Sequence, residues 1–133
     1  VLTITANGIP ELFPVVIKIA KAAPKDRLWK IEALKQRVKL PIMIDYKGTI
    51  LDSKTVEFTY KKSDDGRLEL TVYFPSATDD NLYITYIFLD GIIGEYDTAR
   101  YIKNIEFAAK KNRAYRPLEN LRNVLDNEIK SKK

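Results

Sequence analysis

The sequence contains neither cysteine nor histidine among its 133 residues. These two absences exclude disulfides, thiol nucleophiles, the usual zinc sites and imidazole-based proton relays. Carboxylates, lysines, tyrosines and hydroxyls remain as the groups that could carry chemistry, and magnesium and calcium remain as the metals that carboxylates bind. The lack of cysteine also fits the cytoplasm, which we expect as the location of the protein.

Long apolar runs are absent as well. The longest apolar region, 82–93, is interrupted by Thr85, Asp90 and Gly91, and it is shorter than the roughly 20 residues of a membrane-spanning helix. No basic segment precedes an apolar one at the start of the sequence, so we expect neither a membrane partner nor a signal peptide. With 45% hydrophobic and 31% charged residues, the chain is expected to fold as one globular domain, 1–133.

The net charge of +5 is distributed unevenly along the chain. Residues 1–99 contain 13 Lys and Arg against 14 Asp and Glu, whereas residues 100–133 contain 10 against 4. The centre of this basic region is the stretch KKNRAYR, in which four cationic residues surround one tyrosine. The cationic residues are Lys110, Lys111, Arg113 and Arg116. Such a patch can bind phosphates and stack a base, although basic runs are more often solvated surface.

The clearest predicted element is a β-hairpin over 56–74, where apolar and polar residues alternate on both sides of Asp-Asp-Gly. A two-residue turn would place the apolar residues of the two strands on opposite faces. A three-residue loop, 64–66, instead pairs Phe58 with Val72 and Tyr60 with Leu70, so that one face is wholly apolar. This register also places a glycine where the loop needs a positive φ, and we therefore predict it.

Shorter strands are predicted at 1–6, 29–34 and 42–46, because apolar residues alternate with polar ones there. Between the first two strands, a helix is predicted to begin near Pro10 and Pro14 and to end before Pro24. Its apolar stripe at helical spacing consists of Leu12, Val15, Val16, Ile19 and Ala23.

A second amphipathic helix is predicted from Pro117 onward, since proline is favoured in the first turn of a helix. Its apolar stripe consists of Leu118, Leu121, Leu125 and Ile129. Arg122 and Asp126 are four residues apart and are expected to form an ion pair.

The segment 79–94 favours a strand by residue propensity, but we predict a helix there. Asp79 and Asp80 can cap its start, and Gly94 suits the left-handed position just past its end. The segment is apolar nearly all round, so the helix is expected to be buried against the sheet. Together these elements predict an α+β fold with a mainly antiparallel or mixed sheet of about five to six strands and roughly three helices packed on it.

The stretch LDGIIGEYDTARY, 89–101, is the part of the chain that looks most like a functional site, because it gathers three carboxylates and two tyrosines. After the helix we expect an extended segment leading into a strand, in which Glu95 and Asp97 point the same way. Asp90 lies in the last helical turn, where the helix dipole disfavours a carboxylate, so a cationic partner is expected. Arg100 and Arg116 are the candidates.

Two interpretations of this stretch follow. Asp90, Glu95 and Asp97 could bind magnesium or calcium, with Tyr96 contacting a ligand. Alternatively, they form a helix stop, a turn and an ion pair. We favour the structural interpretation, because the stretch has neither an Asp-rich calcium loop nor phosphate-binding glycines.

Several motifs in the order ITANGIPELFPVVIKIAKAAP, a tryptophan, LDGIIGEYD and RPLENL span the chain. This order resembles a group of uncharacterised bacterial proteins, and the resemblance covers essentially the whole sequence. Its most specific parts are ELFP, 11–14, and GEYD, 94–97. Members often carry an additional N-terminal helical segment that does not appear in this sequence. The resemblance implies the same order of strands and helices, and it implies no activity, cofactor or catalytic residue.

We therefore expect a non-catalytic module that binds another protein or a ligand. Its candidate contact residues are Asp90, Glu95, Tyr96 and Asp97. No catalytic residue, cofactor or metal is predicted. Weak nucleic-acid binding through the basic region is the alternative, and a divalent-metal-dependent enzyme at GEYD is a more remote one.

Overall fold

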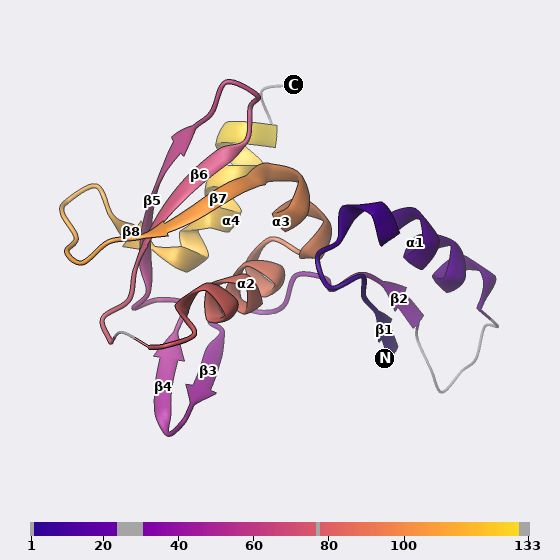
Figure 1. Ribbon diagram of the computed structural model, residues 1–133, viewed down its shortest axis with the longest axis horizontal. Coiled ribbons are helices and arrows are strands. Elements are labelled where there is room, and N and C mark those ends of the chain that lie inside the picture. The colour runs from indigo at the N-terminus through magenta and orange to yellow at the C-terminus, as the bar shows by residue number, and fades with distance from the viewer. Residues whose placement is uncertain (1, 24–30, 77, 131–133) are drawn as a thin grey trace.

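The computed structural model describes residues 2–23, 31–76 and 78–130, whose arrangement is shown in Figure 1. The strands are β1 (Leu2–Ile4), β2 (Ile31–Ala33), β3 (Met43–Tyr46), β4 (Thr49–Asp52), β5 (Glu57–Lys62), β6 (Leu68–Tyr73), β7 (Ile102–Phe107) and β8 (Arg116–Pro117). The α-helices are α1 (Phe13–Ala22), α2 (Asn81–Ile92), α3 (Glu95–Tyr101) and α4 (Leu121–Asn123). Short 3₁₀ helices η1 (Pro10–Leu12) and η2 (Leu118–Asn120) precede α1 and α4, and a π-helix, η3 (Val124–Ile129), follows α4.

The main sheet has the order β7-β6-β5-β8, and its centre is the predicted hairpin. In the β5–β6 ladder Phe58 lies opposite Val72 and Tyr60 lies opposite Leu70. The loop is closed by the backbone N–H of Ser63, which donates to the carbonyl of Arg67 at 2.8 Å. Its last residue, Gly66, has φ +83°. The predicted three-residue loop and its register are confirmed.

Strands β6 and β7 are parallel, and parallel neighbours need a crossover connection, which α2 and α3 provide. One side of α2 is buried in the core with Ile84, Phe88 and Leu89. The predicted helix is confirmed, but complete burial is wrong. Tyr83 and Tyr86 are exposed, because the sheet covers one side of the helix only.

The predicted cap of α2 is confirmed in position only. Asp80 is the N-cap residue, but its side chain makes no capping hydrogen bond. The Asp80 carboxylate instead accepts a hydrogen bond from the Tyr46 hydroxyl at 2.6 Å. The side chain of Asn81 accepts from the backbone N–H of Thr78 at 3.0 Å, which orders the turn before the helix.

Strand β1, helix α1 and strand β2 form a second parallel βαβ unit, which lies beside the main body in Figure 1. Its small core contains Ala6, Phe13, Val16 and Leu34. The predicted helix is confirmed, but most of its predicted apolar stripe is exposed. The two-stranded sheet is narrow, and it covers only the arc of α1 around Phe13 and Val16. The first residues of the predicted strand 29–34, which include Trp29, lie outside the described part.

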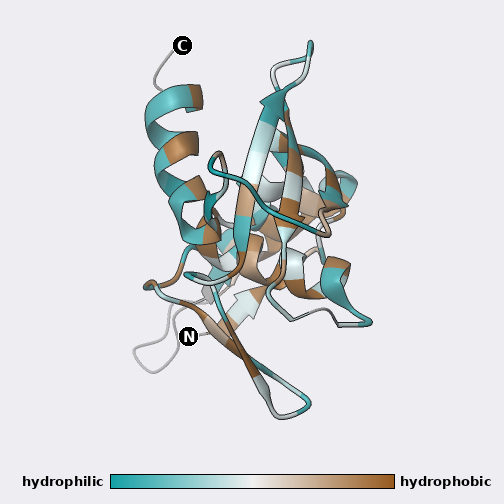
Figure 2. Ribbon diagram, turned by 90° about the vertical axis from the view of Figure 1, so that its left-hand side faces the viewer, coloured by the Kyte–Doolittle hydropathy of each residue, from teal (hydrophilic) through white to brown (hydrophobic). Residues whose placement is uncertain are grey.

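The helical segment that begins at Leu118 closes the core. The predicted helix is confirmed from Leu118 onward, whereas Pro117 ends strand β8. Leu118, Leu121 and Leu125 are completely buried, and Figure 2 shows hydrophobic and hydrophilic residues alternating along the helix. The predicted pair between Arg122 and Asp126 does not form as a hydrogen bond. Arg122 donates to the carbonyl of Ile92 at 2.7 Å, so its guanidinium binds the end of α2 instead.

The α+β class is confirmed, and the strands divide among three small sheets rather than one. Strands β1 and β2 pair with each other, as do β3 and β4, so neither pair extends the main sheet. Within the described residues, no helix is both long and apolar enough to cross a membrane.

Candidate functional site

Two neighbouring helices, α2 and α3, build a concave site on the described structure. Helix α2 contributes Tyr83, Tyr86, Ile87 and Asp90, and the segment from α3 into β7 contributes Glu95, Thr98, Ala99 and Ile102. Both sets have the spacing i, i+3, i+4 and i+7, which places each set on one helical face. The sharp turn at Gly94 makes these two faces meet, and its φ of +92° with ψ of 153° is a conformation open almost only to glycine.

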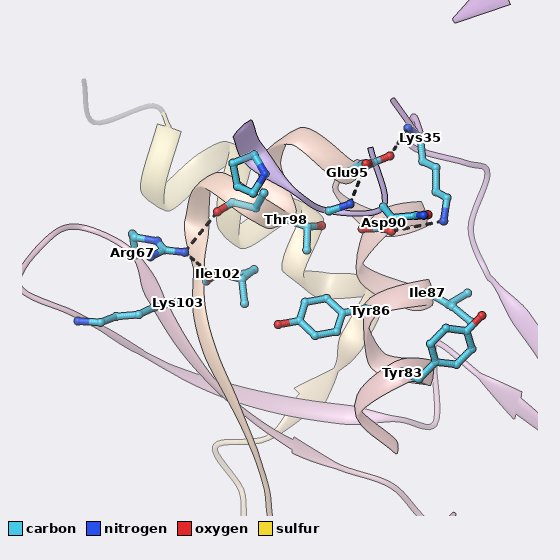
Figure 3. Close-up of a pocket in the computed structure, with 14 residues that line it drawn as sticks. Lys35, Arg67, Tyr83, Tyr86, Ile87, Asp90, Glu95, Thr98, Ile102 and Lys103 are labelled. Atoms are coloured by element: carbon cyan, nitrogen blue, oxygen red, sulfur yellow. Dashed lines mark hydrogen bonds and ion pairs between the residues drawn. The ribbon is translucent and has the colours of Figure 1, made fainter. Parts of the chain in front are cut away.

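Segments far apart in the sequence complete the walls of this pocket. The loop with Asn7, Gly8 and Pro10 lies over α3, and Lys35 follows β2. Arg67 and Lys103 come from the starts of β6 and β7 and line the opposite side, as Figure 3 shows. The cavity has a volume of about 710 Å³, within the range of roughly 300–1,000 Å³ typical of small-molecule sites.

Glu95 holds the N-terminal loop in place. Its side chain is 1% exposed. One carboxylate oxygen accepts from the Thr5 hydroxyl at 2.5 Å and from the Lys35 N–H at 2.9 Å. The other accepts from the N–H groups of Ala6 at 3.1 Å and Gly8 at 3.0 Å. Burial by itself raises the pKa of Glu95, but these four donors outweigh it and lower the pKa below its usual value. The carboxylate is therefore fully engaged as a structural anchor.

Asp90 is the carboxylate of the pocket that stays available. Its nearest cation is the Lys35 ammonium, with 3.9 Å between nitrogen and oxygen, and its side chain is 19% exposed. Burial raises the pKa of Asp90 to about 6, although Lys35 opposes the shift. The expected cationic partner is present, but it is Lys35, and neither Arg100 nor Arg116 takes that role. Asp90 can therefore change its charge close to neutral pH.

The opposite side of the pocket is cationic. The Arg67 guanidinium donates to the carbonyls of Ile102 at 2.7 Å and Ala99 at 3.3 Å, which fixes its position. Its Nε is buried and has no hydrogen-bond partner among the described residues, an arrangement with an unfavourable desolvation energy. Lys103 lies nearby, and its ammonium is 3.9 Å from the carboxylate of Asp65.

The structure separates the residues of GEYD. Residues 95–101 form helix α3, so the predicted extended segment is wrong, and Glu95 and Asp97 do not point the same way. Asp97 contacts Lys130 at 3.0 Å and Arg37 at 3.8 Å outside the pocket. Tyr96 packs on Phe13, with 5.6 Å between the ring centroids. No group of three acidic residues in the described part is arranged to hold a metal ion.

The basic patch lies on the loop between β7 and β8 and on β8 itself. Lys111 forms an ion pair with Glu57 and lies over the ring of Tyr73. Arg116 lies over the ring of Tyr60 at 6.0 Å. Lys110 and Arg113 are exposed. Two of the four cations therefore already contact groups of the main sheet.

Sequence reasoning missed most of the pocket. It selected Asp90 and Glu95, but it did not select Arg67, Lys35 or Lys103, which are far from them in sequence. The spacing of Tyr83, Tyr86, Ile87 and Asp90 was the available signal. It places two tyrosines and one carboxylate on a single face of α2, and such a face in a largely apolar helix indicates contact with solvent or a ligand.

Comparison of the chain with protein-family models, with curated proteins and with solved structures found no match. The resemblance to uncharacterised bacterial proteins therefore stays a prediction based on motifs.

Proposed function

We propose that this protein is a non-catalytic binding module that holds a small organic anion with an apolar or aromatic body in the pocket between α2 and α3. The observation that carries the proposal is the cavity of about 710 Å³, in which two cationic side chains stand opposite a titratable carboxylate. Pockets of this size with a few convergent polar groups are the usual small-molecule sites of proteins. We further propose that the protein is bacterial and is located in the cytoplasm.

The charge distribution favours an anion. Lys35, Arg67 and Lys103 contribute three positive charges to the walls, while Asp90 and Glu95 contribute two negative ones at pH 7. The Glu95 charge is already solvated by four donors, so it compensates Arg67 and Lys103 little. Asp65 partly balances these two cations from outside the pocket lining. An anionic oxygen beside the guanidinium would interact with its positive charge, while the Nε itself is buried out of reach of a ligand.

The remaining walls suit an apolar body. The rings of Tyr83 and Tyr86 extend from α2, with Tyr86 reaching toward the middle of the pocket in Figure 3. Ile87 and Pro10 add aliphatic surface. Aromatic and aliphatic walls of this kind bind a ring or a short alkyl chain.

Several features favour binding over catalysis. The Thr98 hydroxyl donates to the carbonyl of Gly94 at 2.8 Å, and the Thr5 hydroxyl donates to Glu95. Glu95, which faces the Thr5 hydroxyl, has a lowered pKa and is therefore a poor proton acceptor. Thr98 also interacts with Asp90, but its proton is already donated to the Gly94 carbonyl. Asp90 is the one carboxylate of the pocket with a pKa suited to proton transfer, and we assign it to control of the local charge.

The proposal is tested with benzenesulfonate and its neutral analogue benzenesulfonamide, measured by ligand-observed NMR at near-neutral pH. We expect the anion to bind more tightly than the neutral analogue. Arg67→Met and Lys103→Met should each weaken the anion about tenfold, a loss of about 1.4 kcal/mol. Lys62→Met, on the hairpin outside the pocket, is the matched control and should leave binding unchanged.

The pH dependence provides a second readout. Benzenesulfonate keeps its charge between about pH 5 and about pH 8, whereas Asp90 becomes protonated as the pH falls through about 6. Removing the negative charge should strengthen binding at the lower pH, and this change should be absent in Asp90→Asn. Equal binding of the anion by the wild type, Arg67→Met and Lys103→Met would refute the proposed site.

A further inference from the structure

The exposed side of α1 carries a continuous row of large apolar side chains. Leu12, Val15 and Ile19 follow one another at intervals of three and four residues, which places them on one side of the helix. Ile9 extends the row, because the N–H of Leu12 donates to its carbonyl at 3.0 Å and residues three apart in a 3₁₀ turn are aligned. We call Ile9, Leu12, Val15 and Ile19 the apolar ridge.

The apolar ridge is not part of either hydrophobic core. Its four side chains are 47%, 44%, 53% and 51% exposed in chain order, whereas the core side of α1 buries Phe13 and Val16 almost completely. Single exposed apolar residues are normal on protein surfaces, but contiguous ones mark interaction sites. The ridge is therefore a surface that contact with a partner would stabilise.

The shape of the ridge suits a helix. Its length follows from one 3₁₀ turn and about two α-helical turns, which together span roughly 16 Å. A row of side chains at this spacing fits the groove between the rows of another helix. A partner helix of about three turns, with its own apolar side chains at intervals of three and four residues, matches this length.

The charges beside the ridge select the partner. Lys18 and Lys21 are exposed and lie on the flank of α1 that continues from Val15. A pocket beside them is lined by Phe13, Pro14 and Tyr96 in addition to the two lysines. Glu11 is the one acidic residue of η1 and α1, and it lies at the opposite end of the helix from Lys21. A partner that places carboxylates opposite Lys18 and Lys21 meets complementary charge.

We propose that the apolar ridge is the docking surface for an amphipathic helix of a partner protein, and that this helix carries acidic residues along the flank that faces Lys18 and Lys21. The interaction is separate from the pocket between α2 and α3 and requires no ligand there. Apolar contact supplies the affinity, and the two lysines set the orientation and the choice of partner.

Two synthetic helical peptides of about 18 residues test the proposal. Both have the same leucine face, but the flank carries glutamates in one and lysines in the other. We expect fluorescence anisotropy to show at least about tenfold tighter binding of the acidic peptide, equivalent to about 1.4 kcal/mol. The charge reversal Lys18→Glu with Lys21→Glu should invert this preference.

The ridge itself is tested by Val15→Ser with Ile19→Ser, which should abolish binding of the acidic peptide. The matched control is Met43→Ser with Ile50→Ser on β3 and β4, because these residues are at least as exposed, at 63% and 59%, and lie outside the ridge. All four positions are on the surface, so circular dichroism should show an unchanged fold.

Three outcomes would overturn the inference. Equal affinity for the two peptides would show that the lysines do not select the partner. Failure of both peptides to bind would show that the ridge does not dock helices. Self-association in analytical ultracentrifugation that Val15→Ser with Ile19→Ser removes would identify a second copy of the chain as the occupant.

Discussion

Replacing Glu95 with glutamine tests whether this carboxylate anchors the N-terminal βαβ unit to the main body. Glutamine keeps the shape but has one acceptor oxygen in place of two. If that oxygen accepts from Ala6 and Gly8, the amide nitrogen faces the Thr5 hydroxyl, which can turn and accept, and the Lys35 N–H, which cannot. At least one buried donor then lacks a partner, which costs about 1–3 kcal/mol.

The remaining hydrogen bonds also lose the contribution of the negative charge, since bonds to a carboxylate are roughly twice as strong as neutral ones. We therefore expect Glu95→Gln to lower the free energy of unfolding by about 3 kcal/mol at pH 7. The matched control is Asp97→Asn on the same helix. Its partners Lys130 and Arg37 are 40% and 31% exposed, and ion pairs of this kind contribute about 1 kcal/mol or less each.

Urea denaturation, followed by tyrosine fluorescence and by circular dichroism, measures both changes. The pH dependence gives an independent check. Because the pKa of Glu95 is lowered in the folded state, its stabilisation is present above the unfolded pKa of about 4.3 and is lost as the pH falls through the folded value. The difference between wild type and Glu95→Gln should shrink in that acid range. A difference below about 1 kcal/mol at pH 7 would refute the anchor.

Three further predictions concern the same region. The pKa of Asp90 is raised to about 6. The free energy of unfolding of the wild type should therefore fall by as much as about 3 kcal/mol as the pH rises from about 4 to about 6. Denaturation at a series of pH values should show that Asp90→Asn lacks this fall. Gly94→Ala should lower the free energy of unfolding by about 1–3 kcal/mol, because alanine resists the positive φ of Gly94. An unchanged denaturation midpoint would show that the turn does not require glycine. Millimolar magnesium or calcium should leave the melting temperature unchanged, since Glu95 and Asp97 are already engaged; a rise that Asp97→Asn removes would restore the metal interpretation.

The hairpin and the C-terminal helix could be predicted from sequence because their signals are local. One register of the hairpin places every apolar side chain on the same face and Gly66 in the turn, so the pattern left a single solution. The stripe from Leu118 to Leu125 likewise identified both the helix and its buried side. Helix α2 was predicted against residue propensity, because its apolar residues lack the polar alternation of a half-buried strand.

Errors arose where a distant partner determined the outcome. Residues 95–101 were predicted to be extended, yet Glu95 begins a helix and binds the loop 5–8, which is almost ninety positions away in sequence. The expected partner of Asp126, Arg122, is four residues away. Arg37 instead reaches Asp126 with two hydrogen bonds of 2.7 Å and leaves Arg122 to bind the end of α2. The spacing of residues within one helix does not show that a residue from a distant segment takes the place of the local partner.

By itself, the sequence determined the α+β class, the hairpin register, the helices around the core and the excluded cysteine and histidine chemistry, because periodicity and composition are properties of neighbouring residues. Only the tertiary structure decided which helical faces stay open. The narrow β1–β2 pair leaves the apolar ridge of α1 exposed, and the turn at Gly94 brings α2 and α3 together around a pocket. Burial depends on how much surface the neighbouring elements cover, and that area is set by packing between segments far apart in the chain.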